Sequence, residues 1–529
     1  MNQINYVIFC IIDNCRSTHF FDFIKRGLLP NIESLMKNGL YSKNCITDFP
    51  SVTYPTQPTM VTGTYTGDYR RELCHGIPSY SWMGRNIVPP DLRSYGGTGS
   101  DEHIQAYKLN EDLGPNCQTL LEMIDNGNCT SSTQFLSRGT DYLFPESKAK
   151  LAFYYLVMKY ARNVKKMMAR ANTIVVEKLL DTFRRPQKYF ETKEAPVGSF
   201  LWFMSSDVLS HLYGYDSFIY KLNLLHIDKV MGKLVDKLEE MGYLDQIAIG
   251  ITADHGNYKG KRNGNVQKIF HHLNLQNYHP KHNKEGVINI AEYGGVGLFY
   301  FKSKKNHGLS DVWYPPSLEE LRNFGPNKIN IMDKLLELDT TQLMYFRDNS
   351  TGSNEHGTIY LRKKKNGTGK IIKGKIEFKG SGKNLKTRYI TNSEDQDIFG
   401  YNNDEHAAKL LDHRFHTIDE WLDATYPLDY PLYIDHLSRH FKNPRSSDII
   451  LSTQGKTIYN IAHGKKKNDN IYTHDIGLRK SSVVPLIIGG SPEIPQKEIL
   501  YCKGTDIVPT LCKMIGVTPH KSVLGRSLI

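Results

Sequence analysis

Short apolar runs recur along the chain and predict buried strands. The first is Tyr6–Ile12, and similar runs follow at 200–204, 247–253 and 483–488. Continuous apolar runs of this length are typical of strands that helices cover on both faces, as in a parallel sheet. We therefore expect these segments to lie together in one central sheet.

Helical patterns separate these runs. The clearest lies at 216–241, where apolar residues recur every three or four positions and predict a helix that crosses from one strand to the next. Shorter helices are predicted at 30–37 and 507–515. Strands that alternate with helices predict an α/β fold, with a mostly parallel central sheet and helices on both faces.

Two segments have a different pattern and suggest insertions in the core. Residues 146–199 combine helical apolar spacing with basic residues at 159–170 and predict a helical cap. A helix on a membrane surface and a basic wall that binds a charged substrate are the alternatives. Residues 291–400 alternate strand-like runs with glycine-rich turns and predict an inserted α+β cap. The core then comprises 1–145, 200–290 and 401–529, the last with a strand at 447–451.

Acidic and histidine side chains stand near the ends of the predicted core strands. They are Asp13 after the first run, Asp207 and His211 after the second, Asp254 and His255 after the third, and His474 shortly before the fourth. In open α/β sheets, ligands bind at the carboxyl edge of the strands. We therefore expect these side chains to share one site.

A segment rich in proline and threonine, 49–63, holds a candidate nucleophile. Proline biases the residue before it away from the helical region, which predicts a stiff, extended turn at Thr53. A helix is expected to begin near Pro58, where a missing N–H group loses no bond. The N–H groups at a helix N-terminus favour negative charge, so a hydroxyl held there is suited to attack on phosphorus.

Together these motifs resemble the alkaline phosphatase superfamily and, within it, the type I phosphodiesterase/nucleotide pyrophosphatase branch. That branch has an Asp after its first strand, a Thr-aromatic-Pro turn leading into Val-Thr-Gly, then Asp-x-x-x-His, Asp-His-Gly and a late His. The chain carries all five in this order, as Asp13, Thr53-Tyr54-Pro55 before 61–63, Asp207 to His211, Asp254-His255-Gly256 and His474. The resemblance covers about 1–80, 200–256 and 440–529. It implies an alkaline-phosphatase-like core.

The resemblance also implies a hydrolase of phosphate esters that uses two divalent metal ions, zinc in the first place and manganese as the alternative. One ion is expected to bind Asp13, Thr53, Asp254 and His255, and the other Asp207, His211 and His474. Two such ions neutralise a phosphate diester and activate the attacking oxygen. Thr53 is expected to form a phosphothreonine intermediate. Tyr54 and Thr56 are expected to bind substrate, Tyr54 by stacking on a nucleobase.

Two positions depart from the family pattern. Thr56 stands where the phosphodiesterases usually have an Asn of the oxyanion hole, and Asn14 follows Asp13 where glycine is common. Asn tolerates the left-handed conformation, so the second change is mild. The presence of Thr56 instead of Asn leaves the substrate preference open. His463 competes with His474 as the late ligand, and we favour His474 because Val-Pro-Leu-Ile follows it.

Related activities are the alternatives to a phosphodiesterase or nucleotide pyrophosphatase. They are a phosphomonoesterase, a phosphonoacetate-hydrolase-like enzyme that cleaves C–P bonds, and a metal-dependent phosphomutase. A sulfatase is disfavoured because no Cys/Ser-x-Pro-x-Arg segment lies near a strand end. A non-catalytic binding protein is disfavoured because every ligand position is filled.

Composition adds fewer constraints. The chain has 529 residues, of which 39% are hydrophobic, enough for a large core. Its net charge of +12 fits phosphate-bearing substrates or a surface of solvated lysines; the basic segments 159–170 and 363–370 favour an anionic, non-nucleotide substrate as a further alternative. No nucleic-acid-binding motif, secretion signal or transmembrane run is evident, and the eight cysteines show no framework spacing. These features predict a cytoplasmic protein that acts on a small phosphorylated substrate.

Overall fold

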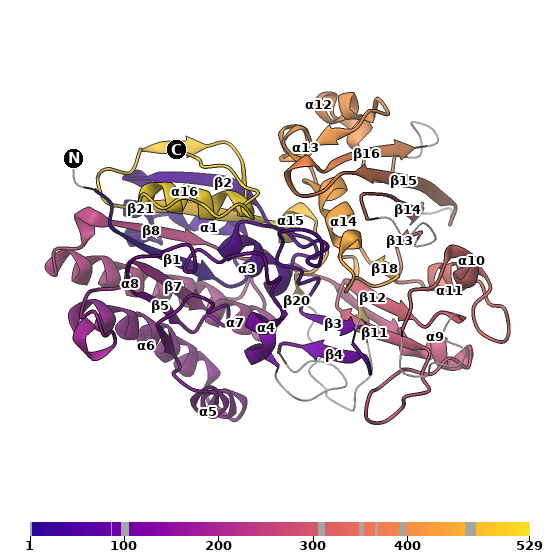
Figure 1. Ribbon diagram of the computed structural model, residues 1–529, viewed down its shortest axis with the longest axis horizontal. Helices are drawn as coiled ribbons and strands as arrows, with labels where there is room; N and C mark the ends of the chain where they lie inside the picture. The colour runs from indigo at the N-terminus through magenta and orange to yellow at the C-terminus, as the bar shows by residue number, and fades with distance from the viewer. Residues whose placement is uncertain are drawn as a thin grey trace.

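Two sheets, each with its own helices, form the two halves of the molecule (Figure 1). The computed structural model describes residues 3–85, 87–96, 105–304, 313–348, 354–365, 369–391, 397–460 and 472–529. Both chain ends lie in the half that holds the first sheet.

A nine-stranded sheet is the centre of the first half. Its strands run in the order β22-β2-β21-β8-β1-β7-β5-β6, and β23 also pairs with β2. They are β1 (Tyr6–Ile12), β2 (Leu40–Ile46), β5 (Cys129–Ser132), β6 (Tyr142–Phe144), β7 (Gly198–Phe203), β8 (Ile247–Thr252), β21 (Val483–Gly490), β22 (Lys497–Ile499) and β23 (Cys502–Lys503). All pairs are parallel except β2–β21 and β21–β8. The expected mostly parallel sheet is confirmed.

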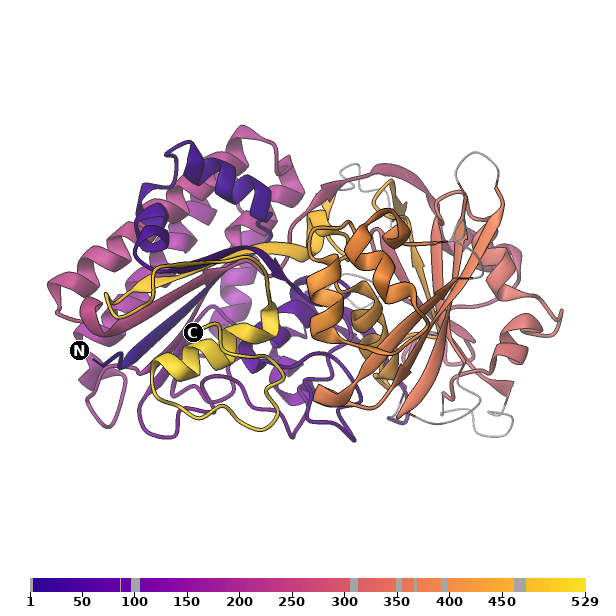
Figure 2. The ribbon, with the colours of Figure 1, turned by 90° about the horizontal axis from the view of Figure 1, so that it is seen from above.

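Helices cover both faces of this sheet (Figure 2). On one face lie α1 (Ser17–Lys25), α2 (Pro30–Lys37), α6 (Val164–Arg184) and α8 (Phe218–Glu240), and on the other lie α3 (Thr53–Thr62) and α16 (Ile507–Met514). Three further helices in this half are α4 (Leu109–Asp112), α5 (Lys148–Lys159) and α7 (Ser205–Tyr213). The crossover helix predicted at 216–241 is α8, whose residues Leu224, Ile227, Val230, Met231, Leu234 and Leu238 are buried in the core of this half.

An antiparallel sheet of eight strands is the centre of the second half. Its order is β11-β12-β18-β13-β14-β15-β16-β17. The strands are β11 (Ile288–Tyr293), β12 (Val296–Phe301), β13 (Leu343–Arg347), β14 (His356–Lys364), β15 (Ile371–Lys379), β16 (Lys386–Thr391), β17 (His416–Thr417) and β18 (Ile449–Ser452). Two apolar clusters cover it, one with α13 (Ile418–Thr425) and α14 (Tyr433–Lys442), the other with α9 (Gln267–His272), α10 (Leu318–Arg322) and α11 (Ile331–Glu337).

Aromatic side chains contribute to the contact between the two halves. The remaining short elements are the hairpin β3 (Ser81–Gly84) and β4 (Asp91–Ser94), the pair β9 (Tyr258–Lys259) and β20 (Tyr472–Thr473), the pair β10 (Lys261–Asn265) and β19 (Thr457–Asn460), α15 (Arg479–Ser482), and α12 (Glu405–Ala408) at the outer end of the second half. Phe49, just before α3, contacts Tyr433 of α14 and Tyr345 of β13 edge to face. The segment that leads into Thr53 is therefore held against the second half.

Three elements differ from the sequence-based expectations. The strand expected in the core at 447–451 is β18, which pairs with β12 and β13 of the second sheet. In the expected cap at 146–199, α6 is a layer of the core because its apolar stripe covers β5 and β7, and α5 extends beyond the sheet. Helix α3 begins at Thr53 rather than near Pro58. Since Tyr54 is extended (φ −120°, ψ 115°), Pro58 falls in the first regular turn, where its missing N–H loses little.

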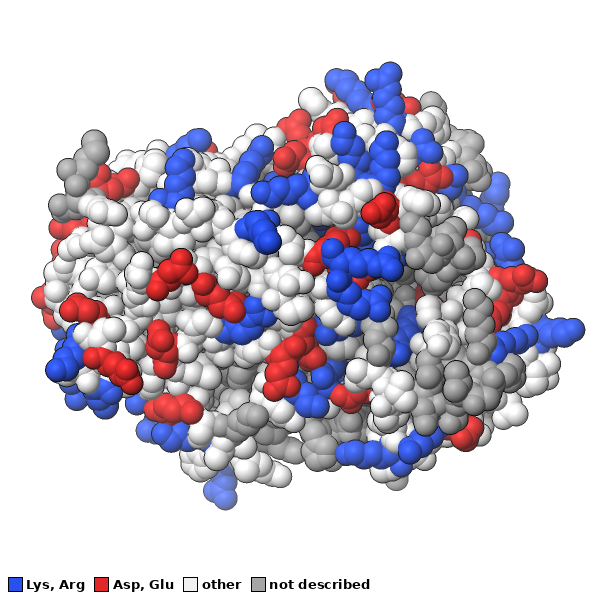
Figure 3. Space-filling model, viewed as in Figure 1, with Lys and Arg blue, Asp and Glu red and all other residues white. Residues whose placement is uncertain are grey.

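The surface shows mixed charge. In the view of Figure 3, lysines and arginines are interspersed with acidic residues over both halves. All eight cysteines are buried free thiols. Among the described residues, none of the helices is both long and apolar enough to cross a membrane.

Candidate active site

The candidate site lies at one edge of the first sheet because three adjacent strands end there. β1 lies between β7 and β8 and is parallel to both, so their carboxyl ends meet at that edge. Asp13 follows β1, and Asp254 and His255 follow β8. Helix α7 begins directly after β7 and presents Asp207 and His211, which are four residues apart and share one helix face.

Three histidines present the same ring nitrogen to the centre of the site. The Nδ1 atoms are each hydrogen-bonded to a backbone carbonyl: His211 to Tyr472 at 2.8 Å, His255 to Gly256 at 3.1 Å and His474 to Ser51 at 3.3 Å. A histidine whose Nδ1 donates to a carbonyl has Nε2 free to bind a metal ion. The three Nε2 atoms are therefore positioned to bind a metal ion in the same space.

The acids and histidines fall into two groups with metal-ligand spacing. In each group the donor atoms all lie within 4.8 Å of one another. One group is Asp207, His211 and His474, and the other is Asp13, Asp207 and His255. The first group is the complete set expected for one of the two ions. Mixed nitrogen and oxygen donors of this kind suit zinc.

Asp13 lies at the centre of a concentration of negative charge. Its Oδ2 accepts a hydrogen bond from the Trp202 indole at 3.1 Å, whereas its Oδ1 is buried and has no hydrogen-bond partner among the described residues. Burial, together with the charges of Asp254 and Asp207, raises the pKa of Asp13 well above its usual value. A buried carboxylate oxygen without a partner, 3.4 Å from His255 Nε2, is what a bound cation would satisfy.

The group of Asp207, His211 and His474 has a different charge balance from the surroundings of Asp13. Burial raises the pKa of Asp207, but His211 and His474 outweigh burial and hold that pKa below its usual range. Burial lowers the pKa of His211, but Asp207 raises it overall. Burial and the charge of His255 lower the pKa of His474 well below its usual value. His474 is thus held as a neutral imidazole, the form that binds metal ions.

Two residues that sequence reasoning did not assign to the site hold its acids in place. Asn14 bridges the two sides, since its Nδ2 donates to Asp207 Oδ1 at 2.7 Å and its backbone N–H to Asp254 Oδ1 at 3.1 Å. It has the left-handed conformation that we considered tolerable (φ 59°). Gln57 donates to Asp254 Oδ2 at 2.8 Å and accepts a hydrogen bond from Gln134 at 2.9 Å. A polar residue after a strand-end acid was the only sequence signal for Asn14.

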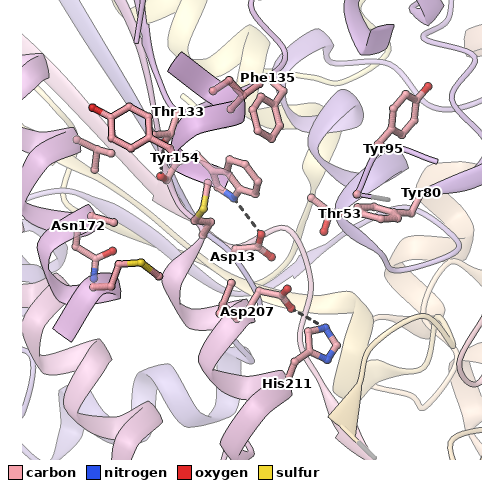
Figure 4. Close-up of a pocket in the computed structure, with 18 of the residues that line it drawn as sticks. Asp13, Thr53, Tyr80, Tyr95, Thr133, Phe135, Tyr154, Asn172, Asp207 and His211 are labelled. Carbon is pink, nitrogen blue, oxygen red and sulfur yellow. Dashed lines mark hydrogen bonds and ion pairs between the residues drawn. The ribbon is translucent and has the colours of Figure 1, made fainter. Parts of the chain in front are cut away.

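The candidate nucleophile is part of this cluster. Thr53 is the first residue of α3, and its Oγ1 lies 3.3 Å from His255 Nε2. Its side chain points toward Asp13 and Asp207 in Figure 4. Ser51, two residues earlier, donates to the carbonyl of His474 at 2.6 Å and accepts from Gly477 N, which ties the turn to the segment after β20 that bears the late histidine.

The two expected substrate-binding residues are packed more tightly than the sequence indicated. The Thr56 hydroxyl is buried and donates to the carbonyl of Val52, the residue before its own helix, at 2.7 Å. The Tyr54 ring is 2% exposed and stacks on Tyr80, with centroids 5.8 Å apart. A substrate-binding role for each stays a prediction. The more accessible ring beside Thr53 is that of Tyr80, which sequence reasoning missed (Figure 4).

A large cavity opens on Thr53 and the metal-ligand cluster. Its volume is about 1620 Å3, and it extends to both sides of the acids. Tyr80 and Tyr95 line it beside Thr53, whereas Tyr154 and Asn172 line it on the opposite side of Asp13 (Figure 4). The site therefore has room for groups on both sides of a bound phosphate.

The adjacent histidines His271 and His272 are not part of the site, because they are exposed at the end of α9 in the second half. His463 lies outside the described residues. The choice of His474 over His463 as the late metal ligand therefore depends on the observed position of His474 alone.

Comparisons with solved structures support the fold. Murine ectonucleotide pyrophosphatase/phosphodiesterase 5 matches with a TM-score of 0.54 and 14% identity, over 97% of this chain and 96% of that chain. An inactive variant of the murine protein in complex with AMP matches with a TM-score of 0.53 and 14% identity, over 98% and 96%. The human protein matches with a TM-score of 0.52 and 13% identity, over 97% and 96%. At such identities the likeness shows a shared fold.

Sequence comparison places the chain in a family. Among curated proteins, no sequence matches significantly. The family described as type I phosphodiesterase/nucleotide pyrophosphatase matches residues 7–313, more than half of the chain, which include β1, α3, α7 and β8. The resemblance inferred from the motifs is thereby confirmed: the chain belongs to the type I phosphodiesterase/nucleotide pyrophosphatase family, a group of phosphoester hydrolases within the alkaline phosphatase superfamily.

Proposed function

We propose that the protein hydrolyses phosphodiesters or nucleotide anhydrides through a covalent intermediate on Thr53. The observation that carries this proposal is the position of the Thr53 hydroxyl, 3.3 Å from His255 Nε2 and inside a cluster of acids and histidines with metal-ligand spacing. A hydroxyl at the start of a helix, beside such a cluster, is positioned for attack on phosphorus.

The residues present fit two divalent ions, with zinc favoured. Asp207, His211 and His474 would hold one ion, and Asp13, Asp254, His255 and Thr53 the other. The orphaned Oδ1 of Asp13 and the three oriented Nε2 atoms support this assignment. When bound, the ions supply Lewis acidity that neutralises the phosphate oxygens and activates the attacking hydroxyl.

The chemistry at Thr53 has two balanced steps. Thr53 Oγ1 attacks phosphorus and loses its proton, while the bond from phosphorus to the leaving oxygen breaks and that oxygen ends protonated as an alcohol or phosphate. The retained ester group then stays attached through phosphorus to Thr53, as a substituted phosphothreonine. A water oxygen next attacks phosphorus, the bond to Thr53 Oγ1 breaks, and Thr53 regains a proton. The net change is addition of one water across the ester bond.

Cavity shape favours diesters over monoesters. A phosphomonoester carries one organic group, whereas the cavity extends both toward Tyr80 and Tyr95 and toward Tyr154 and Asn172. Aromatic rings beside Thr53 suit a nucleobase, because base stacking on an aromatic tolerates any base. The murine relative solved with AMP makes nucleotides a reasonable first class of substrate to test.

The test compares kcat/KM for p-nitrophenyl thymidine monophosphate and p-nitrophenyl phosphate in the metal-loaded protein. We expect the diester to be preferred by at least about tenfold, since one more organic group is bound in the cavity. Tyr80→Ala should reduce this preference more than Tyr314→Ala, a change at an exposed tyrosine of the second half. A monoester preference that Tyr80→Ala leaves unchanged would instead favour a phosphatase or phosphomutase.

A further inference from the structure

We propose that one face of strands β14, β15 and β16 binds a single-stranded nucleic acid through its phosphate backbone. None of the residues that carry this inference lines the cavity beside Thr53. The binding surface is therefore separate from the proposed phosphodiesterase site, and the inference does not depend on the chemistry at Thr53.

The two faces of these strands differ in what covers them. Successive side chains of a strand point to opposite faces of its sheet. One face belongs to the apolar cluster that includes α13 and α14, and its buried residues are Ile359, Leu361, Ile376, Phe378 and Tyr389. On the opposite face, the apolar cluster of α9, α10 and α11 extends only to Tyr360 and Ile371 among the described residues of these strands. The remainder of that face is exposed or half-exposed.

This second face, which we call the basic face, is rich in positive charge. Six of its side chains are cations, namely Arg362, Lys373, Lys375, Lys379, Lys386 and Arg388. Figure 3 shows many lysines and arginines over the part of the second half where β15 and β16 lie in Figure 1. Lys379 lies directly opposite Lys386 in the register of β15 and β16. Like charges directly opposite each other in a sheet are destabilising, so a bound anion would relieve a repulsion that the fold retains.

Acidic side chains only partly offset this charge. Glu377, on the same face, contacts Lys375 at 2.6 Å and Arg388 at 2.7 Å, and Asp333 of α11 contacts Arg362 at 2.7 Å. The exposed cations of the basic face that form no ion pair among the described residues are Lys373, Lys379 and Lys386. On β15 and β16 the cations alternate with residues of the opposite face, which is why the sequence shows no continuous basic motif there.

Aromatic rings lie among these cations. Phe415 is half-exposed, and its ring centroid lies 4.5 Å from both Lys379 Nζ and Arg388 Cζ. Tyr360 is half-exposed and stacks on Phe346, with ring centroids 5.5 Å apart. Proteins that bind single strands combine a basic surface that follows the backbone with aromatic rings on which bases stack. The basic face has both features, whereas the paired bases of a duplex are not free to stack on its rings.

The spacing of charge favours a chain-like anion over a small one. Lys373 and Lys379 are six residues apart on β15, which corresponds to about 20 Å at about 3.4 Å per residue. A single phosphate group contacts only one end of this row, whereas successive phosphates of one strand contact both. An anionic membrane is disfavoured, because surfaces that dock on lipid add apolar side chains to their cations. None of the large exposed apolar residues of the described chain lies on the basic face.

The first experiment measures binding of a short fluorescein-labelled oligothymidylate by fluorescence anisotropy, with Thr53→Ala so that the probe is not cleaved. We expect saturable binding whose association constant falls with salt concentration, with a log–log slope of about −2 to −4 for about three to six neutralised phosphates. An excess of thymidine monophosphate should not displace the probe. Absence of binding at low salt would overturn the inference, and so would displacement by thymidine monophosphate, which would place the probe in the cavity beside Thr53.

A triple variant and a matched control test the location. Lys373→Ala, Lys379→Ala and Lys386→Ala together should weaken binding by at least about tenfold and make the salt slope shallower by about 2. With Thr53 intact, the triple variant should hydrolyse p-nitrophenyl thymidine monophosphate as the wild type does. The control removes three exposed lysines of the first half that form no ion pair among the described residues, by Lys25→Ala, Lys229→Ala and Lys497→Ala. Equal losses of binding in both triple variants would show that only net charge matters and would contradict the inference.

A second comparison tests the class of partner. Phe415→Ala should weaken binding of the oligothymidylate by at least about fivefold, because base stacking on one ring is lost. Phe218→Ala, at a phenylalanine of α8 that is 71% exposed, should leave binding unchanged. Unlabelled oligothymidylate should displace the probe at a lower concentration than a duplex or phosphatidylserine vesicles, each counted by its phosphate groups. Equal competition by the duplex or by the vesicles, with no effect of Phe415→Ala, would contradict a single-stranded partner.

Discussion

At the scale of single residues, the site is a set of strand-end acids and histidines held by their neighbours. Asp13, Asp254 and His255 could be anticipated because each directly follows an apolar run that becomes a buried strand. Asn14 and Gln57 could not, because their role depends on hydrogen bonds to Asp207 and Asp254, which lie about 190 or more residues away in the chain. Sequence therefore predicts the candidate ligands better than it predicts what orients them.

Asn14 gives the first prediction at this scale. Asn14→Ala removes the side-chain bond to Asp207 and should weaken metal binding by about 10- to 100-fold, as is typical when a partner of a ligand is lost. A chelator-competition titration with zinc measures the affinity. Asn5→Ala, which removes an exposed bond to Gln246, is the matched control and should leave affinity unchanged. Equal affinity in both variants would show that Asn14 does not position the site.

His474 gives the second prediction at the scale of single residues. His474→Ala removes one of three donors in the group with Asp207 and His211, so we expect the purified protein to lose one of two metal equivalents and most of its turnover. Metal content by mass spectrometry and steady-state kinetics measure both. His272→Ala, at an exposed histidine of α9, should change neither. Full metal content in His474→Ala would move the late ligand elsewhere, with His463 the first position to examine.

At the scale of elements, two short helices set the geometry of the site. Helix α7 starts immediately after β7, so one turn places Asp207 and His211 over the sheet edge. Helix α3 starts at Thr53, earlier than the prolines indicated, but the extended backbone at Tyr54 separates Thr53 from the regular helix. Local sequence rules identified the turn at Thr53, but the break at Tyr54 also depends on packing against Tyr80 and Tyr95.

A buried histidine of helix α14, next to the segment that leads into Thr53, is expected to make the stability of the protein depend on pH. His440 is fully buried against Phe49, and neither ring nitrogen has a hydrogen-bond partner among the described residues. Burial lowers the pKa of His440 from 6.5 to about 4. At pH values between these two pKa values, His440 binds a proton in the unfolded chain but not in the folded protein. The free energy of unfolding should therefore fall as pH drops from 6.5 toward 4, by up to about 3 kcal/mol.

Denaturant unfolding at several pH values measures this change. His440→Leu should flatten the dependence, since the group that takes up the proton on unfolding is gone. His406→Leu removes an exposed histidine of α12 and should keep the wild-type slope. A steep acid dependence that His440→Leu leaves unaltered would assign the effect to other groups.

At the scale of the whole molecule, the first half contains the central sheet and the candidate site, and the second half is built on the antiparallel sheet and packs against the segment that leads into Thr53. The apolar runs predicted β1, β7, β8 and β21, the four adjacent strands at the centre of the first sheet, because each is one continuous apolar segment. The second sheet was harder to predict, since β18 inserts between β12 and β13 although about 100 residues separate it from β13. No local pattern specifies such long-range pairing, and the strand was therefore expected in the core.

Metal removal tests the assembly of the site as a whole. We expect the purified protein to hold two divalent ions, zinc in the first place, and to lose activity on treatment with a chelator. Zinc or manganese should restore it. Because the ions bind only the folded protein, the melting temperature should also fall in the metal-free form. Full activity in a preparation verified as metal-free would exclude the two-ion site.

The most direct test of the central claim is a search for the covalent intermediate on Thr53. The metal-loaded protein is mixed with p-nitrophenyl thymidine monophosphate, quenched in acid within milliseconds, digested and analysed by mass spectrometry. We predict a thymidine-phosphoryl group on the peptide that contains Thr53, reduced turnover in Thr53→Ser, and neither adduct nor turnover in Thr53→Ala. Undiminished hydrolysis by Thr53→Ala, with no adduct on the wild-type peptide, would contradict the account.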